Sequence, residues 1–270
     1  MKRTNTRPEN KCSTSLVGII GGVGPHAGLD FMRKIFNNTI AVKDQDHIST
    51  VLISCPALIP DRTCFLLDEE KENPAEGMSE CAGKLYAAGA GYVCVACNTA
   101  HSGRIFAPFC RSVEESFPGL RVVNMLETCA GYVKQYLPKV KTIGYLATKG
   151  TYASGVYREY FSADQGFTLI EPEIQGQERI HEAIYSKEFG IKAHSDPVHP
   201  KARSILLYET FKLSDRGADA VILGCTELPL AVNPLDFSIP ILDPGLLTAR
   251  RLIGLVAPEK LMSEPVLNLS

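Results

Sequence analysis

Two cysteines stand at matching positions in two similar stretches of the sequence. Residues 89–99, which contain Cys97, align without a gap with residues 217–227, which contain Cys225. In each stretch an apolar run leads into the cysteine and small or polar residues follow, so a strand is expected to end there and a helix to begin. Open α/β sheets bind their ligands at the carboxyl ends of their strands. The repeat therefore predicts one site with a thiol on each side.

Two thiols facing one carbon atom suit the inversion of a stereocentre by proton transfer. That reaction needs a base on one face of the carbon and an acid on the other. A free cysteine has a pKa of about 8.5 and a helix N-terminus lowers it, so thiol and thiolate can exchange these roles near neutral pH. Asn98, Thr99 and the first N–H groups of the helix after Cys97 are predicted to form an anion cradle beside the sulfur. This scheme needs no cofactor.

Other interpretations of these cysteines have weaker support. Cys94 and Cys97 form a C-x-x-C pair, but no second pair or matching histidines accompany it, which disfavours a zinc site. A thioredoxin-like site places both cysteines at the start of a helix, whereas Cys94 lies inside the apolar run. Cys225 taken alone could equally be a buried structural thiol. The repeat favours the two-thiol site, and no metal is expected.

Predicted strands and helices alternate along the chain, which is typical of an α/β fold with largely parallel sheets. The expected strands are residues 16–20, 50–54, 93–96, 120–125, 142–148, 168–170, 220–223 and 240–244. The expected helices are one from the end of the first loop to about residue 37, then residues 73–88, 152–161, 177–185, 202–216 and 246–255. The repeat predicts two pseudo-symmetric domains, residues 16–117 and 118–239, with the active site in the cleft between them.

Two features of the first half could bind a substrate. The loop at residues 21–25 has three glycines, but it lacks the Lys-Ser/Thr ending of a P-loop and the full dinucleotide spacing. We expect a small-ligand loop in which Gly22 lets the backbone approach the substrate. Arg62 follows the second strand, where an arginine can clamp a carboxylate through a paired hydrogen bond. The alternative for Arg62 is an ordinary surface charge.

The composition excludes several kinds of partner. The formal net charge of −2 and a pI near 6.3 give no electrostatic footprint for nucleic acid or an anionic membrane. No apolar run approaches the roughly 20 residues that a membrane span needs. Residues 1–15 lack the apolar segment of a secretory signal and are expected to be a disordered tail. Nine irregularly spaced cysteines fit reduced thiols in a cytoplasmic protein better than a disulfide framework.

The cysteine motifs resemble those of the aspartate/glutamate racemase family, the amino-acid racemases that work without PLP. The likeness rests on residues 96–101 and 224–227 and extends over residues 17–255. Residues 21–25 and 59–63 resemble the aspartate racemase branch in particular. The resemblance implies two pseudo-symmetric α/β domains with Cys97 and Cys225 as the acid/base pair. It also implies a homodimer, no cofactor, and a C-terminal helix within residues 240–257 that packs back on the first domain, leaving a tail at 258–270.

The resemblance also assigns substrate-binding residues. By position, Arg62 matches the carboxylate-binding arginine, and Lys192 resembles a second cationic ligand, with the nearby Lys187 as its rival. Thr226 and Glu227 follow the second cysteine and are expected to line the site.

Three features of this chain bear on those assignments. The glutamate-specific branch has Asp-Ser in the first loop and His after the second Cys-Thr, where this chain has Gly21-Gly22 and Glu227. The polar loop from His194 to Pro200 is expected to alter the cleft. His101 is either a partner of the active-site residues or a core histidine.

These observations predict an isomerase: a cofactor-independent racemase of aspartate, possibly also of glutamate. Two enzymes on the same fold are alternatives, a cis-trans isomerase of dicarboxylates and a decarboxylase. A decarboxylase is expected to have a single catalytic cysteine, so the presence of both Cys97 and Cys225 disfavours it. A catalytically silent amino-acid-binding protein is a further alternative, and it would bind dicarboxylates without exchanging the α-hydrogen.

Overall fold

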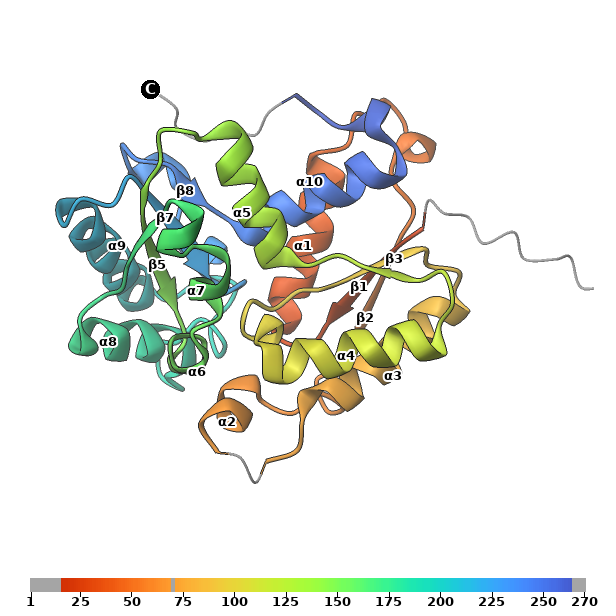
Figure 1. The fold of residues 1–270 in the computed structure, drawn as a ribbon, viewed down its shortest axis with the longest axis horizontal. Coiled ribbons are helices and arrows are strands. Elements are labelled where there is room, and N and C mark those ends of the chain that lie inside the picture. Colours follow the sequence, from red (N-terminus) through yellow and green to blue (C-terminus); the bar gives the residue numbers. More distant parts are fainter. Residues whose placement is uncertain (1–15, 69–70, 264–270) are drawn as a thin grey trace, which may run out of the picture.

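Two parallel four-stranded sheets form the framework of the molecule. The computed structural model describes residues 16–68 and 71–263, so the expected N-terminal tail and residues 264–270 lie outside the described part. The first sheet has the order β2-β1-β3-β4 and the second β6-β5-β7-β8, with every pair parallel (Figure 1). The strands are β1 (Val17–Gly21), β2 (Thr50–Ser54), β3 (Tyr92–Val95), β4 (Arg121–Val122), β5 (Thr142–Ala147), β6 (Thr168–Ile170), β7 (Ala220–Gly224) and β8 (Ile241–Leu242). The α/β prediction is confirmed, and both sheets share one strand order.

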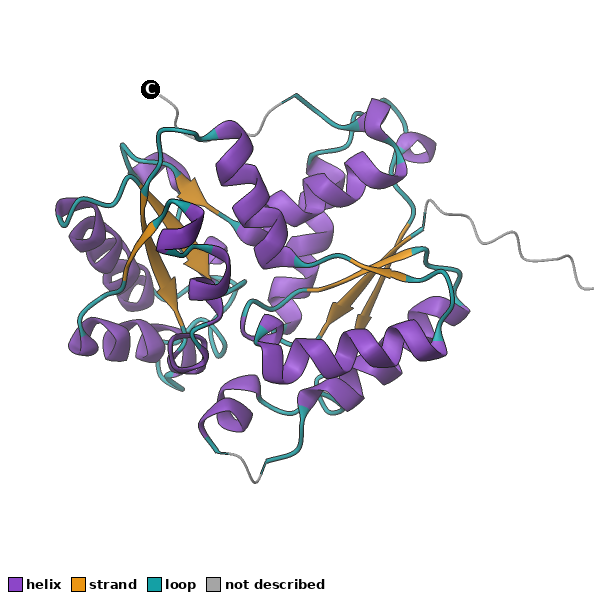
Figure 2. Cartoon of the chain, viewed as in Figure 1, coloured by secondary structure: helices purple, strands orange, loops and turns teal. Residues whose placement is uncertain are grey.

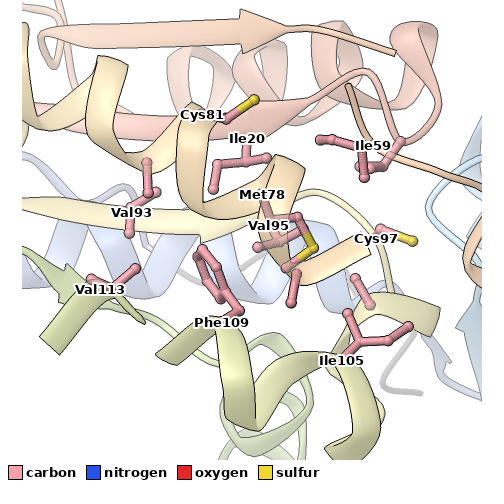
Figure 3. Packing of buried hydrophobic residues seen from close by; sticks show 14 of the residues in the cluster. Ile20, Ile59, Met78, Cys81, Val93, Val95, Cys97, Ile105, Phe109 and Val113 are labelled. Atoms are coloured by element: carbon pink, nitrogen blue, oxygen red, sulfur yellow. The ribbon is translucent and has the colours of Figure 1, made fainter. Parts of the chain in front are cut away.

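Helices cover both faces of the first sheet (Figure 2). Because side chains alternate across a strand, Val93 and Val95 pack with α3 (Pro74–Ala87) and α4 (Gly103–Ser116), while Cys94 packs with α1 (Pro25–Asn37) and α10 (Pro244–Val256). Burial raises the pKa of the Cys94 thiol, which argues against a redox pair with Cys97. Figure 3 shows Cys97 at the edge of the first cluster, with its sulfur directed away from Val95.

The second sheet repeats this arrangement. On β7, Ala220 and Ile222 pack with α5 (Met125–Tyr136), α6 (Lys149–Ser154) and α7 (Val156–Tyr160). Val221 and Leu223 pack on the other face with α8 (Ile174–Tyr185) and α9 (Pro200–Asp215), and Cys225 belongs to that cluster. Each cysteine therefore follows the third strand of its half and ends one row of core side chains. The two halves present their thiols in equivalent places.

Helix α10 connects the halves. It follows β8 of the second sheet but packs between α1 and α5, as Figure 1 shows in blue. Its buried residues Ala249, Leu252 and Ile253 share a cluster with Phe31 and Ile35 of α1. At its start, the Lys34 ammonium on α1 lies 2.5 Å from the carboxylate of Asp243, which caps α10. The chain thus closes the first half with its last helix.

The predicted elements differ from the structure at three places. The strand expected at residues 120–125 is only Arg121–Val122, because Asn124 caps a helix, its Oδ1 accepting from two backbone N–H groups, and α5 begins at Met125. The helix expected at 152–161 is split at Gly155, whose φ is 65°. The helix expected directly after Cys97 is a short 3-10 turn, Thr99–His101, and α4 starts only at Gly103. In addition, α2 (Arg62–Leu67) and α5 were not predicted.

Within residues 16–68 and 71–263, no helix has both the length and the apolar character needed to cross a lipid bilayer.

Candidate active site

The two cysteine motifs touch each other across the two halves. Thr226, the residue after Cys225, donates its hydroxyl to the carbonyl of Ala96 at 3.0 Å. Asn98, the residue after Cys97, accepts at Oδ1 from the Tyr157 hydroxyl of the second half at 2.8 Å. Both cysteines are only 6% exposed. The sheets therefore bring the two thiol-bearing turns to one place.

A cluster of threonines extends this contact. The Thr99 hydroxyl lies 2.8 Å from that of Thr151 on α6 and 3.4 Å from that of Thr148, and Thr63 of the first half donates to Thr148 at 3.3 Å. All four threonines are buried. Thr99 was expected to take part in an anion cradle, and its hydroxyl already has partners in the other half. In the structure, Thr99 lies where the two halves of the chain meet.

Arg62 is buried at the start of α2, whereas the sequence suggested an arginine in a loop. It donates Nη2 to the Val23 carbonyl at 2.9 Å and Nη1 to the Pro60 carbonyl at 3.2 Å, so the glycine loop fixes its side chain. Burial would lower the pKa of Arg62, but the neighbouring Cys97 and Asp61 offset burial and raise that pKa above its usual value. Arg62 therefore stays cationic beside the first thiol.

Gly22 is required by the backbone around it. Its φ is 78°, and a Cβ at this position would lie 2.8 Å from the backbone nitrogen of Cys55, at the end of β2. Gly24 has a φ of 128°, and a Cβ there would meet the side-chain carboxylate of Glu227 from the other half. The glycine loop of the first half thus lies directly against the second cysteine motif.

Glu227 joins the second thiol to a lysine. Cys225 donates its thiol to Oε2 of Glu227 at 3.0 Å, and the Lys192 ammonium lies 2.6 Å from Oε1. Glu227 is 3% exposed. Burial and the adjacent carboxylate raise the pKa of Cys225 well above its usual value. Burial would lower the pKa of Lys192, but Glu227 offsets it and the pKa of Lys192 ends above its usual value. Lys192 thus lies on the far side of Glu227 from the Cys225 thiol, whereas Lys187 is exposed.

Two site residues, Asp61 and Tyr185, were missed at the sequence level. Tyr185, at the end of α8, donates its hydroxyl to Oδ2 of Asp61 at 3.1 Å. The Lys192 ammonium lies 5.1 Å from the centroid of the Tyr185 ring. Asp61 also caps α2 through the backbone N–H of Cys64. These residues link the arginine of one half to the lysine of the other, and no local sequence pattern marks a tyrosine at the end of a helix as special.

His101 positions the turn that carries Cys97. Its Nε2 accepts from the backbone N–H of Met125 at 3.2 Å, so the proton lies on Nδ1, which donates to the Cys97 carbonyl at 2.8 Å. Burial lowers the pKa of His101 to about 4. Neutral His101 thus ties the Cys97 turn to the start of α5, which makes it a structural partner of the site.

Two buried donors beside Cys97 have no hydrogen-bond partner among the described residues. They are Nε of Arg62 and Nδ2 of Asn98. A buried donor left unpaired costs about 1–3 kcal/mol, so such groups are rare unless a ligand completes them. The site therefore combines two thiols, a cation near each thiol, and two buried N–H donors without a partner among the described residues. This combination suits proton transfer at a carbon next to a carboxylate.

Comparison with known proteins places the chain in a family. Residues 20–252 match the family model described as Asp/Glu/Hydantoin racemase. The structure superposes on an aspartate racemase from Picrophilus torridus with a TM-score of 0.77 at 27% identity, covering 92% of this chain and 96% of that one. This chain belongs to the Asp/Glu/hydantoin racemase family, which confirms the resemblance seen in its cysteine motifs.

Curated relatives include racemases of different specificity. A broad specificity amino-acid racemase, RacX, from Bacillus subtilis is 23% identical over 245 residues, covering 88% of this chain and 97% of its own. A glutamate racemase from Roseiflexus sp. is 28% identical over 231 residues, covering 79% of this chain and 77% of its own. The chain is therefore of the amino-acid racemase type, an isomerase, while its relatives differ in the substrate that their names give.

We expect His101→Gln to remove part of the acid sensitivity of folding. The pKa of His101 is about 4 in the folded protein and about 6.5 when unfolded. The folded protein binds fewer protons between these values, so this contribution to stability is complete above pH 6.5 and is lost as the pH falls toward 4. Urea denaturation should show the wild-type free energy of unfolding falling more steeply than the variant's, by up to about 1.4 kcal/mol per pH unit. His47→Gln, at an exposed ring, is the control, and parallel curves for His101→Gln would contradict the assignment.

Glu227→Gln should make Cys225 more reactive. The Glu227 carboxylate raises the pKa of Cys225, so a neutral amide lowers that pKa and increases the thiolate fraction. Peptide mapping after timed iodoacetamide treatment at pH 8 should show faster alkylation of Cys225 in the variant. The exposed Cys64 in the same sample is the internal reference. Unchanged or slower alkylation of Cys225 would show that Glu227 does not hold the thiol protonated.

Proposed function

We propose that this protein racemises an acidic amino acid, aspartate or glutamate, without a cofactor and by a two-base mechanism. The observation that carries the proposal is the contact between the two cysteine motifs, in which Thr226 hydrogen-bonds to Ala96. That contact joins the two turns that carry the buried thiols, which supports a site with one thiol on each side. A single-base enzyme would have no need of the second thiol, whereas inversion needs a proton donor on the face opposite the base.

The surroundings of the two thiols differ, and this difference supports starting roles for them. Cys225 is a thiol that donates to Glu227, so it is ready to give a proton. Cys97 lies beside the cationic Arg62 guanidinium. In one direction the Cys97 thiolate takes the α-proton and Cys225 delivers its own proton to the opposite face. In the reverse direction the Cys225 thiolate takes the proton and the Cys97 thiol returns one.

Two cations of the site, Arg62 and Lys192, could each bind one carboxylate of a dicarboxylic amino acid. Arg62 and the unpartnered Nδ2 of Asn98 would hold the α-carboxylate, which spreads the negative charge that develops at Cα. Lys192 would face the side-chain carboxylate from the second half. The names of the relatives, which include an aspartate racemase and a glutamate racemase, support an acidic substrate. The homodimer, the cytoplasmic location, the cofactor independence and the domain boundaries stay predictions.

Arg62→Lys should lose about 100-fold in kcat/KM although it keeps the charge. Arg62 is held by two backbone carbonyls and leaves Nε for the substrate. Lysine lacks this planar fork, and a misplaced substrate costs on the order of 10²-fold. Circular dichroism of L-aspartate and L-glutamate conversion measures the rate. Arg33→Lys, on the exposed face of α1, is the matched control. Wild-type kinetics in Arg62→Lys would remove Arg62 from the site.

The two-thiol mechanism is tested by isotope transfer from solvent. Starting from one L-enantiomer in deuterium oxide, the D-product should carry deuterium at Cα while the remaining L-substrate holds much less early in the reaction. The reason is that the far thiol delivers a solvent-derived deuteron, whereas the near thiol returns the original proton. Mass spectrometry of the separated enantiomers reads both labels. A silent binding protein would label neither.

Cys97→Ser and Cys225→Ser should each abolish racemisation, because a serine hydroxyl is far too weak an acid to replace a thiol at neutral pH. Cys64→Ser, at an exposed cysteine, is the control and should racemise normally. Racemisation near the wild-type rate in either active-site variant would show that the repeat is only structural.

A further inference from the structure

The side chain of Tyr157, on α7, contacts both cysteine motifs. Its hydroxyl donates to Oδ1 of Asn98, the residue after Cys97, at 2.8 Å. Its ring lies against Gly224, the residue before Cys225, where a Cβ would be 3.1 Å from Cε2 of the ring. Tyr157 is fully buried. One side chain of the second half thus touches the neighbours of both thiols.

Packing holds the Tyr157 ring in this place. Its centroid lies 4.8 Å from that of Tyr145 and 6.3 Å from that of Phe161, and all three rings belong to one buried cluster. Burial raises the pKa of Tyr157 well above its usual value, so the phenol stays protonated and can donate. The hydroxyl makes one hydrogen bond among the described residues, the one to Asn98. Tyr157 is therefore a fixed donor with a single acceptor.

This hydrogen bond determines which end of the Asn98 amide is left over. A carboxamide carries an acceptor oxygen at one end and an N–H donor group at the other. Because Oδ1 accepts from Tyr157, the remaining end is Nδ2, which is buried without a partner among the described residues. A reversed amide could donate to the Tyr157 oxygen, but the buried phenol proton would then lack an acceptor, which is unfavourable. Tyr157 therefore favours the orientation that offers a donor.

We propose that Tyr157 is a positioning residue, which holds the Asn98 amide so that Nδ2 can donate to the α-carboxylate of the substrate. The inference rests on the proposed racemase function. Tyr157 belongs to the second half and Asn98 to the first, so this donor is oriented only where the halves meet. The contact with Gly224 sets the Cys225 turn against the same ring. The carboxylate donor and the second thiol thus share one support.

A double-mutant cycle tests the proposal. The kcat/KM of racemisation of L-aspartate and L-glutamate is measured for wild type, Tyr157→Phe, Asn98→Ala and the double variant. Tyr157→Phe keeps the ring and removes the hydroxyl, and it should lower kcat/KM about tenfold, as expected for one hydrogen bond to a charged group. The double variant should stay within about twofold of Asn98→Ala, because the amide that Tyr157 orients is already absent. A merely structural role would lower kcat/KM about tenfold in both backgrounds.

Tyr160→Phe is the matched control. Tyr160 lies on the same helix, and its hydroxyl accepts from Nδ2 of Asn124 at 2.8 Å, so the substitution removes the same kind of contact away from the cysteine motifs. Tyr160→Phe should retain the wild-type kcat/KM. Thermal unfolding followed by circular dichroism verifies that each variant folds.

Asn98→Asp tests the orientation with Tyr157 intact, and it also serves if Tyr157→Phe does not fold. Aspartate keeps one oxygen for the Tyr157 hydroxyl and puts a second, negatively charged oxygen in the place of Nδ2. This variant should fall at least about tenfold below Asn98→Ala in kcat/KM, because the new charge repels the substrate carboxylate. An amide that offered its oxygen to the substrate would tolerate the change. A kcat/KM of Asn98→Asp at or above that of Asn98→Ala would therefore overturn the inference.

The outcomes separate this inference from the proposed function. Wild-type kinetics in Tyr157→Phe, or an equal loss in both backgrounds, would overturn the role of Tyr157 and leave the racemase function standing. Isothermal titration calorimetry with the same acids and variants covers a protein that binds without turnover. In that case the racemase function is wrong, and the same cycle measured on Kd decides the role of Tyr157. If neither acid is bound or racemised, both proposals are wrong.

Discussion

The contact between the two halves determines what this molecule can do. Each half supplies only one of the two cysteine motifs, so a site with a thiol on both sides needs both halves. The hydrogen bond from Thr226 to the Ala96 carbonyl and the one from Tyr157 to Asn98 hold the two turns together. These bonds are buried, where an unmade hydrogen bond costs about 1–3 kcal/mol. The buried threonines around Thr151 add further contacts between the halves. The relative position of the two thiol-bearing turns is therefore held by polar contacts of the residues next to the cysteines.

The site is symmetric in its backbone and asymmetric in its chemistry. Both cysteines follow the third strand of a sheet with one shared strand order. Beyond that point the halves differ, because Cys97 has a guanidinium beside it and Cys225 has a carboxylate. A repeat supplies two equivalent positions, and the side chains around each position give the two thiols different surroundings.

The architecture followed from the sequence because the strands are short, mainly apolar runs with clear ends. Strands β2 and β6 have the predicted bounds, and the repeat around Cys97 and Cys225 indicated two similar halves. Segments whose form depends on distant contacts were not predicted. Met125 starts a helix where a strand was expected, because Asn124 caps that helix and His101 binds its first N–H. The 3-10 turn after Cys97 likewise carries Thr99 to its partners in the other half.

The residues of the candidate site divide in the same way, into those that a local sequence pattern marks and those that only the fold brings together. Cys97, Cys225, Arg62, Lys192 and Glu227 were expected from the cysteine repeat and the family resemblance, and the structure places them near one another. Tyr185 and Asp61 were not found, because their hydrogen bond joins residues more than one hundred positions apart. The roles given to Thr99 and Gly22 rested on local pattern alone. In the structure, the Thr99 hydroxyl bonds to the other half, and Gly22 meets the backbone of Cys55.

Helix α10 also has a consequence for how the chain reaches its native form. The face of the first sheet that carries Val17, Ile19 and Cys94 is completed by Ala249, Leu252 and Ile253 from the other end of the sequence. During synthesis, the first half therefore leaves the ribosome with the part of this apolar face that α10 covers still exposed. It stays so while the whole second half is made, a period in which exposed apolar surface favours aggregation. The first half reaches its native packing only after α10 has been made.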